Sequence, residues 1–433
     1  MNTPPSRDSL STVQAAVLAH LDSARLWRRI EALSAFTEPN RPWTRRAFTP
    51  LHDASRAWLR AEMEAAGLRV ALDAAGNLVG RRPGTRADAA PLVTGSHCDT
   101  VVAGGRFDGI IGVLAGIEVA HALQDASVTL EHPFEVVDFL SEEPSDYGIS
   151  CVGSRGAVGM LDEAMLACTR ADGETLAQGM RRIGANPGLL LPPARLAGGT
   201  AAFVELHIEQ GPVLEARQIP IGVVSHIVGI RRVQIDIVGQ PDHAGTTPMD
   251  LRRDALVGAS RLIDAAYQRA SALSGQPHYV VATVGRIEIS PNAPNAVPGK
   301  AVLTLEVRSD SDAVLDTFPE ALLADYSGAL AQVRVTASMR ALSRSHPTAC
   351  SPMIMDAITQ SAGQLGYATL TMPSGAGHDA AYMACSGPMG MVFIPCLNGR
   401  SHCPEEWIEP EQLLDGTRVL AATLMGLDQA LGG

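Results

Sequence analysis

Potential metal ligands follow four short apolar runs that lie far apart in the sequence. Each run has a histidine or a glutamate at or just beyond its end, and these residues are His97, the pair Glu142 and Glu143, His207 and His402. Strand ends of one mainly parallel sheet meet at the same edge, so side chains hundreds of residues apart can converge there. The pattern therefore predicts an α/β fold with a polar site at the carboxyl edge of its sheet.

The first run leads into a glycine-rich loop, GSHCDTVVAGGRFDGIIG, which spans residues 95–112. This loop carries His97, Asp99 and Asp108, and the apolar stretch 110–123 after it is long enough for a buried helix. Imidazole and carboxylate groups at a strand end are those with which α/β proteins hold a hard or borderline cation. A histidine two residues before an aspartate is more often a local hydrogen bond, so the metal interpretation depends on the other three runs.

The pattern of elements changes between residues 222 and 342. Strands are expected at 233–238, 279–289, 302–307 and 333–339, and helices at 254–273 and 313–330. This order is that of the ferredoxin-like split βαβ unit. We therefore predict a first domain formed by 1–222 and 343–433, with an inserted domain at 223–342, in line with the two or three domains typical of 433 residues. The first domain should also contain helices at 11–35 and 53–66, a hairpin at 68–82 and an interrupted helical region at 161–195.

Composition narrows the class of protein. Acidic residues outnumber basic ones by 46 to 34, and no Lys/Arg run could track a phosphate backbone, which argues against nucleic acid and anionic membranes as partners. No apolar run approaches the roughly 18 to 20 residues of a membrane span. The start, MNTPPSRDSL, lacks the apolar core of a secretion signal, and the seven scattered cysteines include no CxxC pair. A cytoplasmic protein with reduced thiols is expected.

Six motifs together are similar to one known family. GSHCDT with FDG, SEE, ELHIEQG, HAGTTPM, GHDA and SHCPEE resemble the M20 metallohydrolases, in particular their amidase/hydantoinase/carbamoylase branch. The resemblance extends from about Leu92 to Glu406. It implies a zinc-exopeptidase-like three-layer αβα catalytic domain that carries an inserted ferredoxin-like α+β lid and dimerisation domain. A homodimer formed through the lids is the assembly that it implies.

The resemblance also implies two metal ions per subunit that share Asp108 as a bridging ligand. One ion would be held by His97, Asp108 and His207, and the other by Asp108, Glu143 and His402. Asp99 would accept the second ring N–H of His97 and so fix its tautomer. Nitrogen and oxygen ligands suit zinc, and they also suit manganese or cobalt.

Glu142 matches the position of the general base, which would take a proton from water and pass it to the departing nitrogen. Two adjacent glutamates alone would more often be a solvated loop pair, but here they follow a buried strand.

His243 would polarise the scissile carbonyl, often in the partner subunit's site, whereas a lone histidine without this motif would more often be structural. The residues implied for substrate binding are Gln210, His243, Asn295, Arg308 and His378, with Asn295 and Arg308 holding a carboxylate.

The reaction implied first is hydrolysis of the carbamoyl C–N bond of an N-carbamoyl-L-amino acid, giving the amino acid, ammonia and carbon dioxide. The segment EEPSDYGISCVGSR resembles the EEPTRFGISCLGSR pattern of ureidoglycolate amidohydrolases, but Ser145, Asp146 and Tyr147 replace Thr, Arg and Phe. Hydrolysis of ureidoglycolate or allantoate is therefore the second hypothesis. A metallo-dipeptidase is third, because His207 stands where peptidases more often have a carboxylate. None of the metal ligands or the general base that the resemblance implies is missing, which argues against a non-catalytic protein on the same scaffold. A dinucleotide-binding protein is not expected either, because no GxGxxG motif follows a strand into a helix.

Overall fold

The computed structural model describes residues 10–190, 199–275 and 277–432, which form two compact units. Unit 1 comprises residues up to 225, 350–372 and 377 onward, and unit 2 comprises 226–349 and 373–376. Unit 2 thus begins and ends a few residues later than the predicted 223 and 342, and it takes in a short later segment. No helix of the described residues is both long and apolar enough to cross a membrane.

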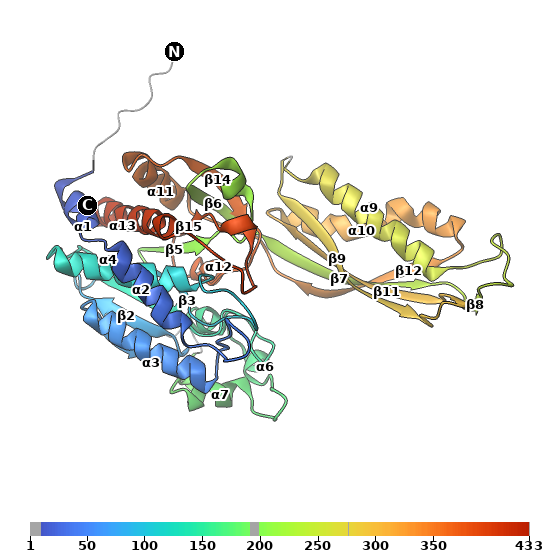
Figure 1. Ribbon diagram of the computed structural model, residues 1–433, viewed down its shortest axis with the longest axis horizontal. Helices are drawn as coiled ribbons and strands as arrows, with labels where there is room; N and C mark the ends of the chain where they lie inside the picture. The colour runs from blue at the N-terminus through green and yellow to red at the C-terminus, as the bar shows by residue number, and fades with distance from the viewer. Residues whose placement is uncertain (1–9, 191–198, 276, 433) are drawn as a thin grey trace, which may run out of the picture. The chain divides into compact units, whose positions relative to one another are not determined.

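Among the described residues, the larger sheet has nine strands in the order β1-β2-β4-β3-β5-β15-β6-β13, with β14 paired to β6. Figure 1 labels β2, β3, β5, β6, β14 and β15 of this sheet. The neighbours β4, β3, β5 and β15 run parallel, whereas the β1–β2, β2–β4, β15–β6 and β6–β13 pairs are antiparallel. The predicted mainly parallel sheet is therefore mixed, with parallel pairs among the central strands β4, β3, β5 and β15. The strands are β1 Arg69–Leu72, β2 Leu78–Arg82, β3 Leu92–His97, β4 Phe134–Phe139, β5 Ala202–Ile208, β6 Ile221–Ile227, β13 Thr348–Ala349, β14 Thr369–Ser374 and β15 Met389–Ile394.

Alternation along the central strands separates two buried faces. In β5, Val204 and Leu206 pack into the main hydrophobic core with α4 (Ile110–Asp125) and α13 (Pro410–Gly432). Phe203 points to the opposite face, where it meets Phe139 of β4 with ring centroids 6.0 Å apart. The short helices α5 (Val152–Ala157) and α12 (Ala380–Met383) contact β4, β5 and β15.

The remaining helices of unit 1 correct several predictions from the sequence. The single helix expected at 11–35 is wrong: α1 (Thr12–Ala19) and α2 (Ser23–Ser34) are separate, because Asp22 is extended and its side chain caps α2 at Arg25 N. The helix expected at 53–66 begins earlier, since Thr49 caps α3 (Pro50–Ala65). The hairpin at 68–82 is confirmed by β1 and β2. The other helices are α6 Glu163–Leu166, α7 Leu176–Arg182, α8 Val213–Arg217 and α11 Pro352–Gln364. The interrupted helical region expected at 161–195 contains α6, α7 and the short 3-10 helix Pro187–Leu189, and its last residues, 191–195, lie outside the described residues.

Unit 2 has a four-stranded antiparallel sheet in the order β12-β7-β11-β9, with α9 and α10 packed against it. Its elements follow one another as β-α-β-β-α-β, the order predicted from the sequence. Val233, Ile235 and Ile237 of β7 alternate into a separate core with Leu262 and Phe318 of the helices. The bounds are β7 Gly229–Val238, β8 Asp242–His243, α9 Ala255–Leu273, β9 Val280–Ser290, β10 Ala296–Val297, β11 Lys300–Ser309, α10 Asp312–Gln332 and β12 Thr336–Arg344.

Candidate metal centre and active site

The four parallel strands bring the polar residues of the sequence pattern to one edge of the sheet. His97 is the last residue of β3, and Glu142 follows the end of β4 at Phe139 by three positions. His207 lies inside β5, one residue before its end, on the face opposite Leu206. His402 follows β15 after a loop. The convergence predicted from strand ends is therefore present within unit 1.

We call His97, Asp108 and His207 the inner group. Their potential ligand atoms all lie within 4.8 Å of one another. Asp108 Oδ1 is 3.1 Å from His207 Nε2 and 3.8 Å from His97 Nε2. All three residues are buried, with His97 2% and His207 1% exposed. The inner group is a compact set of two imidazoles and one carboxylate in a dry environment.

We call Asp108, Glu143 and His402 the outer group. Their potential ligand atoms also lie within 4.8 Å of one another. His402 Nε2 is 3.2 Å from Asp108 Oδ2 and 3.0 Å from Glu143 Oε1. In contrast to the inner group, the His402 side chain is 48% exposed. Asp108 thus offers one oxygen to each group, which is the arrangement of a bridging carboxylate.

The inner imidazoles are oriented by backbone carbonyls. His97 Nδ1 lies 3.0 Å from the Asp99 carbonyl oxygen, and His207 Nδ1 lies 2.8 Å from the Ile208 carbonyl oxygen. A carbonyl oxygen only accepts, so Nδ1 carries the proton in both rings and Nε2 is left to face Asp108. This is the orientation in which an imidazole can bind a cation through Nε2.

Asp99 has a different role from the one predicted. Its carboxylate is 3.7 Å from His97 Nδ1, so the expected hydrogen bond to that carboxylate is wrong, and the backbone carbonyl of Asp99 takes its place. The carboxylate instead accepts the backbone N–H groups of Glu142 at 3.3 Å and Glu143 at 3.2 Å. Asp99 therefore holds the turn that presents both glutamates.

Gly109 provides the close approach that the inner group needs. Its φ is +69°, and a Cβ at this position would lie 2.2 Å from His97 Nε2. Its N–H donates to His207 Nε2 over 3.1 Å. Only glycine combines this backbone conformation with the space that the His97 ring occupies.

The charges of the two groups are those of a cation site. Burial lowers the pKa of His97, but the nearby carboxylates of Glu142, Asp99 and Asp108 outweigh it and raise this pKa to about 10. Hydrogen bonds to Asp108 and Glu143 raise the pKa of His402 to about 11. In the metal-free protein, protons thus neutralise part of a carboxylate-rich cluster. Three imidazoles and two carboxylates directed at shared positions fit divalent zinc, manganese or cobalt.

Glu142 lies beside the inner group and outside both ligand sets. Its Oε2 is 3.7 Å from His97 Nε2, while Cys151 Sγ donates to its Oε1 over 3.3 Å. Burial raises the pKa of this carboxyl well above its usual value. A carboxyl beside a potential metal ligand is the kind of group that can exchange a proton with water bound there.

Two of the predicted substrate-binding residues lie next to the ligand groups. Gln210 Nε2 donates to Asp108 Oδ2 over 2.5 Å. His378 is buried and its ring meets that of His207 edge-on, with centroids 4.5 Å apart. Burial lowers the pKa of His378 well below its usual value, so this imidazole is neutral at pH 7.

The other predicted substrate-binding residues belong to unit 2. His243 in β8 and Asn295 lie close together, since Ala244 N donates to the Asn295 carbonyl oxygen over 3.0 Å. Arg308 in β11 pairs with Glu306, with Nε 2.7 Å from Oε1, and its Nη1 donates to the Gly375 carbonyl oxygen. The roles of these three residues stay predictions.

Sequence reasoning missed several buried carboxylates around the ligand groups. Glu205 accepts a hydrogen bond from Ser96 over 2.6 Å, and Asp379 accepts one from Ser154 over 2.5 Å. Glu205 precedes His207 by two positions in β5, so strand alternation could have placed it on the same face. Asp379 follows His378 directly, but its partner is 225 residues away and no local signal points to it.

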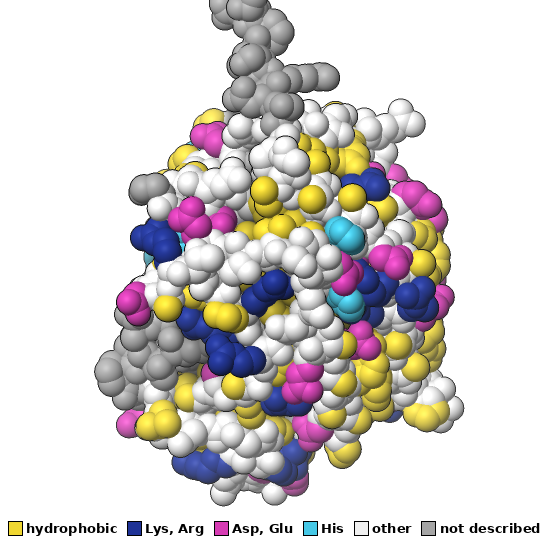
Figure 2. Space-filling model, turned by 90° about the vertical axis from the view of Figure 1, so that its left-hand side faces the viewer, with side chains coloured by type: hydrophobic (Ala, Val, Ile, Leu, Met, Phe, Trp, Pro, Cys, Tyr) yellow, Lys and Arg dark blue, Asp and Glu magenta, His cyan; other side chains and the backbone are white. Residues whose placement is uncertain are grey.

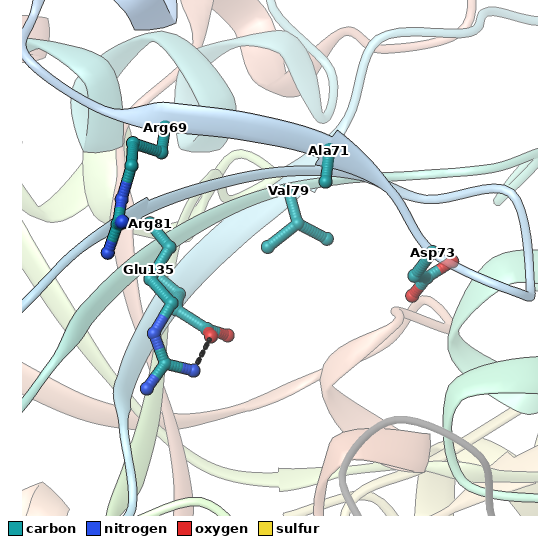
Figure 3. A pocket seen from close by; sticks show the side chains of 6 residues that line it. All are labelled: Arg69, Ala71, Asp73, Val79, Arg81 and Glu135. Atoms are coloured by element: carbon teal, nitrogen blue, oxygen red, sulfur yellow. Dashed lines mark hydrogen bonds and ion pairs between the residues drawn. The ribbon is translucent and has the colours of Figure 1, made fainter. Parts of the chain in front are cut away.

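A pocket of about 310 Å³ lies elsewhere in unit 1 (Figure 3). Strands β1, β2 and β4 supply most of its lining, and the neighbouring side chains of Arg81 and Glu135 form an ion pair at 3.0 Å on one side of it. It contains none of the ligand groups, so its chemistry is separate from theirs. On the face shown in Figure 2, Lys and Arg side chains lie among Asp and Glu side chains instead of forming one continuous positive track.

The comparison with known proteins identifies the family. A sequence model of peptidase family M20/M25/M40 matches residues 93–426, most of the chain. The chain belongs to this family. It is 37% identical to an N-carbamoyl-L-amino-acid amidohydrolase of Paenarthrobacter aurescens, over 95% of this chain and all of the relative. The resemblance of the sequence motifs to M20 and its carbamoylase branch is thereby confirmed.

Two further relatives are similar to this chain over most of its length. A ureidoglycolate hydrolase of Arabidopsis thaliana is 32% identical over 96% of this chain and 89% of the relative. The crystal structure of an amidase of the hydantoinase/carbamoylase family from Burkholderia multivorans matches with a TM-score of 0.88 and 37% identity, covering 94% of this chain and 98% of that one. The mixed α/β fold is therefore that of M20 enzymes of the carbamoylase type.

Proposed function

We propose that this protein is a dinuclear metal-dependent amidohydrolase that cleaves the carbamoyl C–N bond of N-carbamoyl-L-amino acids. The products would be the amino acid, ammonia and carbon dioxide. The observation that carries the proposal is that two ligand groups share Asp108, with Glu142 beside them and outside both sets. The 37% identity to a relative named N-carbamoyl-L-amino-acid amidohydrolase supports the substrate class.

The inner and outer groups would hold one divalent cation each, zinc first, with manganese or cobalt as alternatives that suit the same donors. Such cations polarise a carbonyl and lower the pKa of attacking water from 15.7 toward roughly 7. His97 and His207 would bind through Nε2, because their Nδ1 protons are engaged by backbone carbonyls.

Glu142 would act as the general base and then as the acid. Its Oε1 is engaged by the Cys151 thiol, so Oε2, on the His97 side, is the oxygen that takes the proton from water. The same carboxyl would return the proton to the departing nitrogen, which leaves as ammonia. The neutral ring of His378 would add no positive charge against the inner group.

Unit 2 would serve as a lid and as the surface through which a homodimer forms. Its residues His243 and Asn295, which lie close together, would bind the substrate carbonyl and carboxylate with Arg308. An arginine suits this role because its planar fork binds a carboxylate bidentately. Gln210 would complete the substrate contacts from unit 1. All seven cysteines are free, which fits a reducing compartment such as the cytoplasm.

Hydrolysis of ureidoglycolate or allantoate is the second candidate. Asp146 stands where the ureidoglycolate pattern has an arginine, but Arg46 Nη2 lies 2.6 Å from Asp146 Oδ1. This ion pair neutralises the charge of Asp146, but it leaves no unpaired cation where the pattern has its arginine. The 32% identity to the ureidoglycolate hydrolase of Arabidopsis thaliana supports this second candidate. A dipeptidase would use the same ligand groups and base, and we rank it third.

Ammonia release tests the proposal directly. The protein would be stripped of metal, reloaded with zinc or manganese, and offered N-carbamoyl amino acids, N-carbamoyl-β-alanine, ureidoglycolate, allantoate and dipeptides. We expect metal-dependent ammonia release that is greatest with an N-carbamoyl-L-amino acid. Activity confined to ureidoglycolate or allantoate would select the second candidate. If the protein binds two cations but releases no ammonia from any ureido compound, the proposed substrate class is wrong, while the proposed metal centre is not contradicted.

A further inference from the structure

A buried glutamate connects the loops that carry Asp108 and His402. Glu406 is 1% exposed, and its Oε1 accepts the backbone N–H groups of Phe107 at 2.7 Å and Asp108 at 3.1 Å. Its Oε2 lies 2.9 Å from Ser401 Oγ. Ser401 Oγ is in turn 2.5 Å from Asp108 Oδ2. The carboxylate therefore reaches the bridging aspartate twice, once through its backbone and once through a hydroxyl.

The loop before Asp108 is shaped to admit this carboxylate. A Cβ on Gly105 would lie 1.9 Å from Glu406 Cδ and from Oε1. Gly105 does not have a positive φ, so its backbone conformation is open to alanine. Space for the Glu406 side chain, and not backbone strain, is what glycine provides at this position.

We infer that Glu406 is a positioning residue for the bridging ligand Asp108, and that it fixes the spacing between the inner and the outer group. Its carboxylate holds the backbone of Asp108 by hydrogen bonds to the N–H groups of Phe107 and Asp108. Through Ser401 it also contacts the segment that carries His402. This inference rests on the metal site in the proposed function, but it does not depend on the substrate. A residue that positions a bridging ligand should control the affinity for cations even when no substrate is present.

The test compares cation dissociation constants in three variants, measured by competition with a chelator in the absence of substrate. Glu406→Ala should weaken cation binding by about 10- to 100-fold, the range for residues that support metal ligands. Gly105→Ala should do the same, because the methyl group displaces the Glu406 carboxylate. The double variant Gly105→Ala/Glu406→Ala should be no weaker than Glu406→Ala, because the methyl group then enters space already vacated.

Three further variants separate positioning from general stabilisation. Glu406→Gln should bind cations almost as wild type, since an amide oxygen can still accept both N–H groups and its NH₂ can donate to Ser401. Ser401→Ala leaves those backbone groups paired, and it should weaken the cation of the outer group more than that of the inner group. The matched control is Glu405→Ala. The Glu405 side chain is 61% exposed and makes a long ion pair of 3.9 Å with Arg400, so its removal should leave both cation dissociation constants unchanged.

Unchanged cation affinities in Glu406→Ala and Ser401→Ala, with two cations bound to the wild type, would overturn this role and leave the proposed function intact. Additive losses in the double variant would also overturn it, because the two changes would then act separately. A wild-type protein that binds fewer than two cations would contradict the dinuclear function itself, and this role with it.

Discussion

The inner and outer ligand groups share Asp108 and use the same kinds of donor, but they are built differently. The inner histidines belong to strands β3 and β5 and are 2% and 1% exposed. The outer group takes Glu143 from a turn and His402 from a loop, where His402 has φ +57° and a side chain that is 48% exposed. Strands hold a ligand more rigidly than loops do. The inner group is therefore the more preorganised of the two groups, and the outer group is the more open to solvent.

The largest expected effect comes from replacing Glu142, the proposed base, while both ligand groups stay intact. Glu142→Gln should lower turnover by about two to four orders of magnitude, the usual contribution of a general base. Both cations should remain, because Glu142 is in neither ligand set. Turnover is measured by ammonia release and cation content by elemental analysis, with Glu405→Gln as the exposed control. Full turnover in Glu142→Gln with two cations bound would remove Glu142 from the mechanism.

A change at Gly109 should break the inner group selectively. In Gly109→Ala the methyl group would lie 2.2 Å from His97 Nε2, at a residue with φ +69°. We expect cation affinity at the inner group to fall by about 100-fold or more, since the ring must leave its place. The control is Gly363→Ala, where nothing lies within 4 Å of the added Cβ. If Gly109→Ala binds both cations as tightly as the wild type does, the close packing of Gly109 against His97 has no role in holding the inner cation.

Exposure predicts the order in which the cations leave. Dialysis against a chelator should remove the outer cation first, because His402 is half exposed and the inner histidines are buried. His402→Ala should lose the outer cation only, and keep about one cation per subunit at chelator concentrations that wild type tolerates. Elemental analysis over time follows both processes. Loss of the two cations together, in wild type and in His402→Ala, would show that the groups form a single cooperative site.

The smallest effect concerns the Cys151 thiol that engages Glu142. Cys151→Ala removes one hydrogen bond of about 1 kcal/mol, which corresponds to roughly a fivefold loss in kcat. Cys151→Ser keeps a donor and should restore most of this loss, while KM stays unchanged in both variants. Steady-state kinetics would decide this. A serine variant as slow as the alanine variant would mean that the thiol contributes by filling space.

The features that the sequence predicted correctly are those with a local signal. Apolar runs ending in His97, Glu142 and His207 placed these residues at one sheet edge, and periodicity gave the order of elements in unit 2. Asp22 was missed as a helix cap, so one helix was expected where α1 and α2 form. The mixed sheet was also missed, because a buried strand has the same apolar pattern whether its neighbour is parallel or antiparallel.

Features that depend on distant partners were beyond the sequence. The carboxylate of Asp99 was expected on the nearby His97, but it binds the backbone of Glu142 and Glu143, more than 40 residues away in sequence. Glu406 stands in a motif recognised for His402, yet its own partner, Asp108, is 298 residues away. Tertiary packing decides such pairings, so they cannot be predicted from local sequence patterns.

Calorimetric titration of the metal-stripped protein with zinc, at pH 7.5 in two buffers of different ionisation enthalpy, tests the dinuclear centre most directly. The pKa of His97 is about 10 and that of His402 about 11 in the metal-free protein, so both imidazoles are protonated at this pH and each must give up a proton to bind a cation. We expect two binding events, the tighter one at the inner group, with a net release of protons to which His97 and His402 both contribute. A single binding event, or binding without proton release, would contradict a centre of two ligand groups that share Asp108.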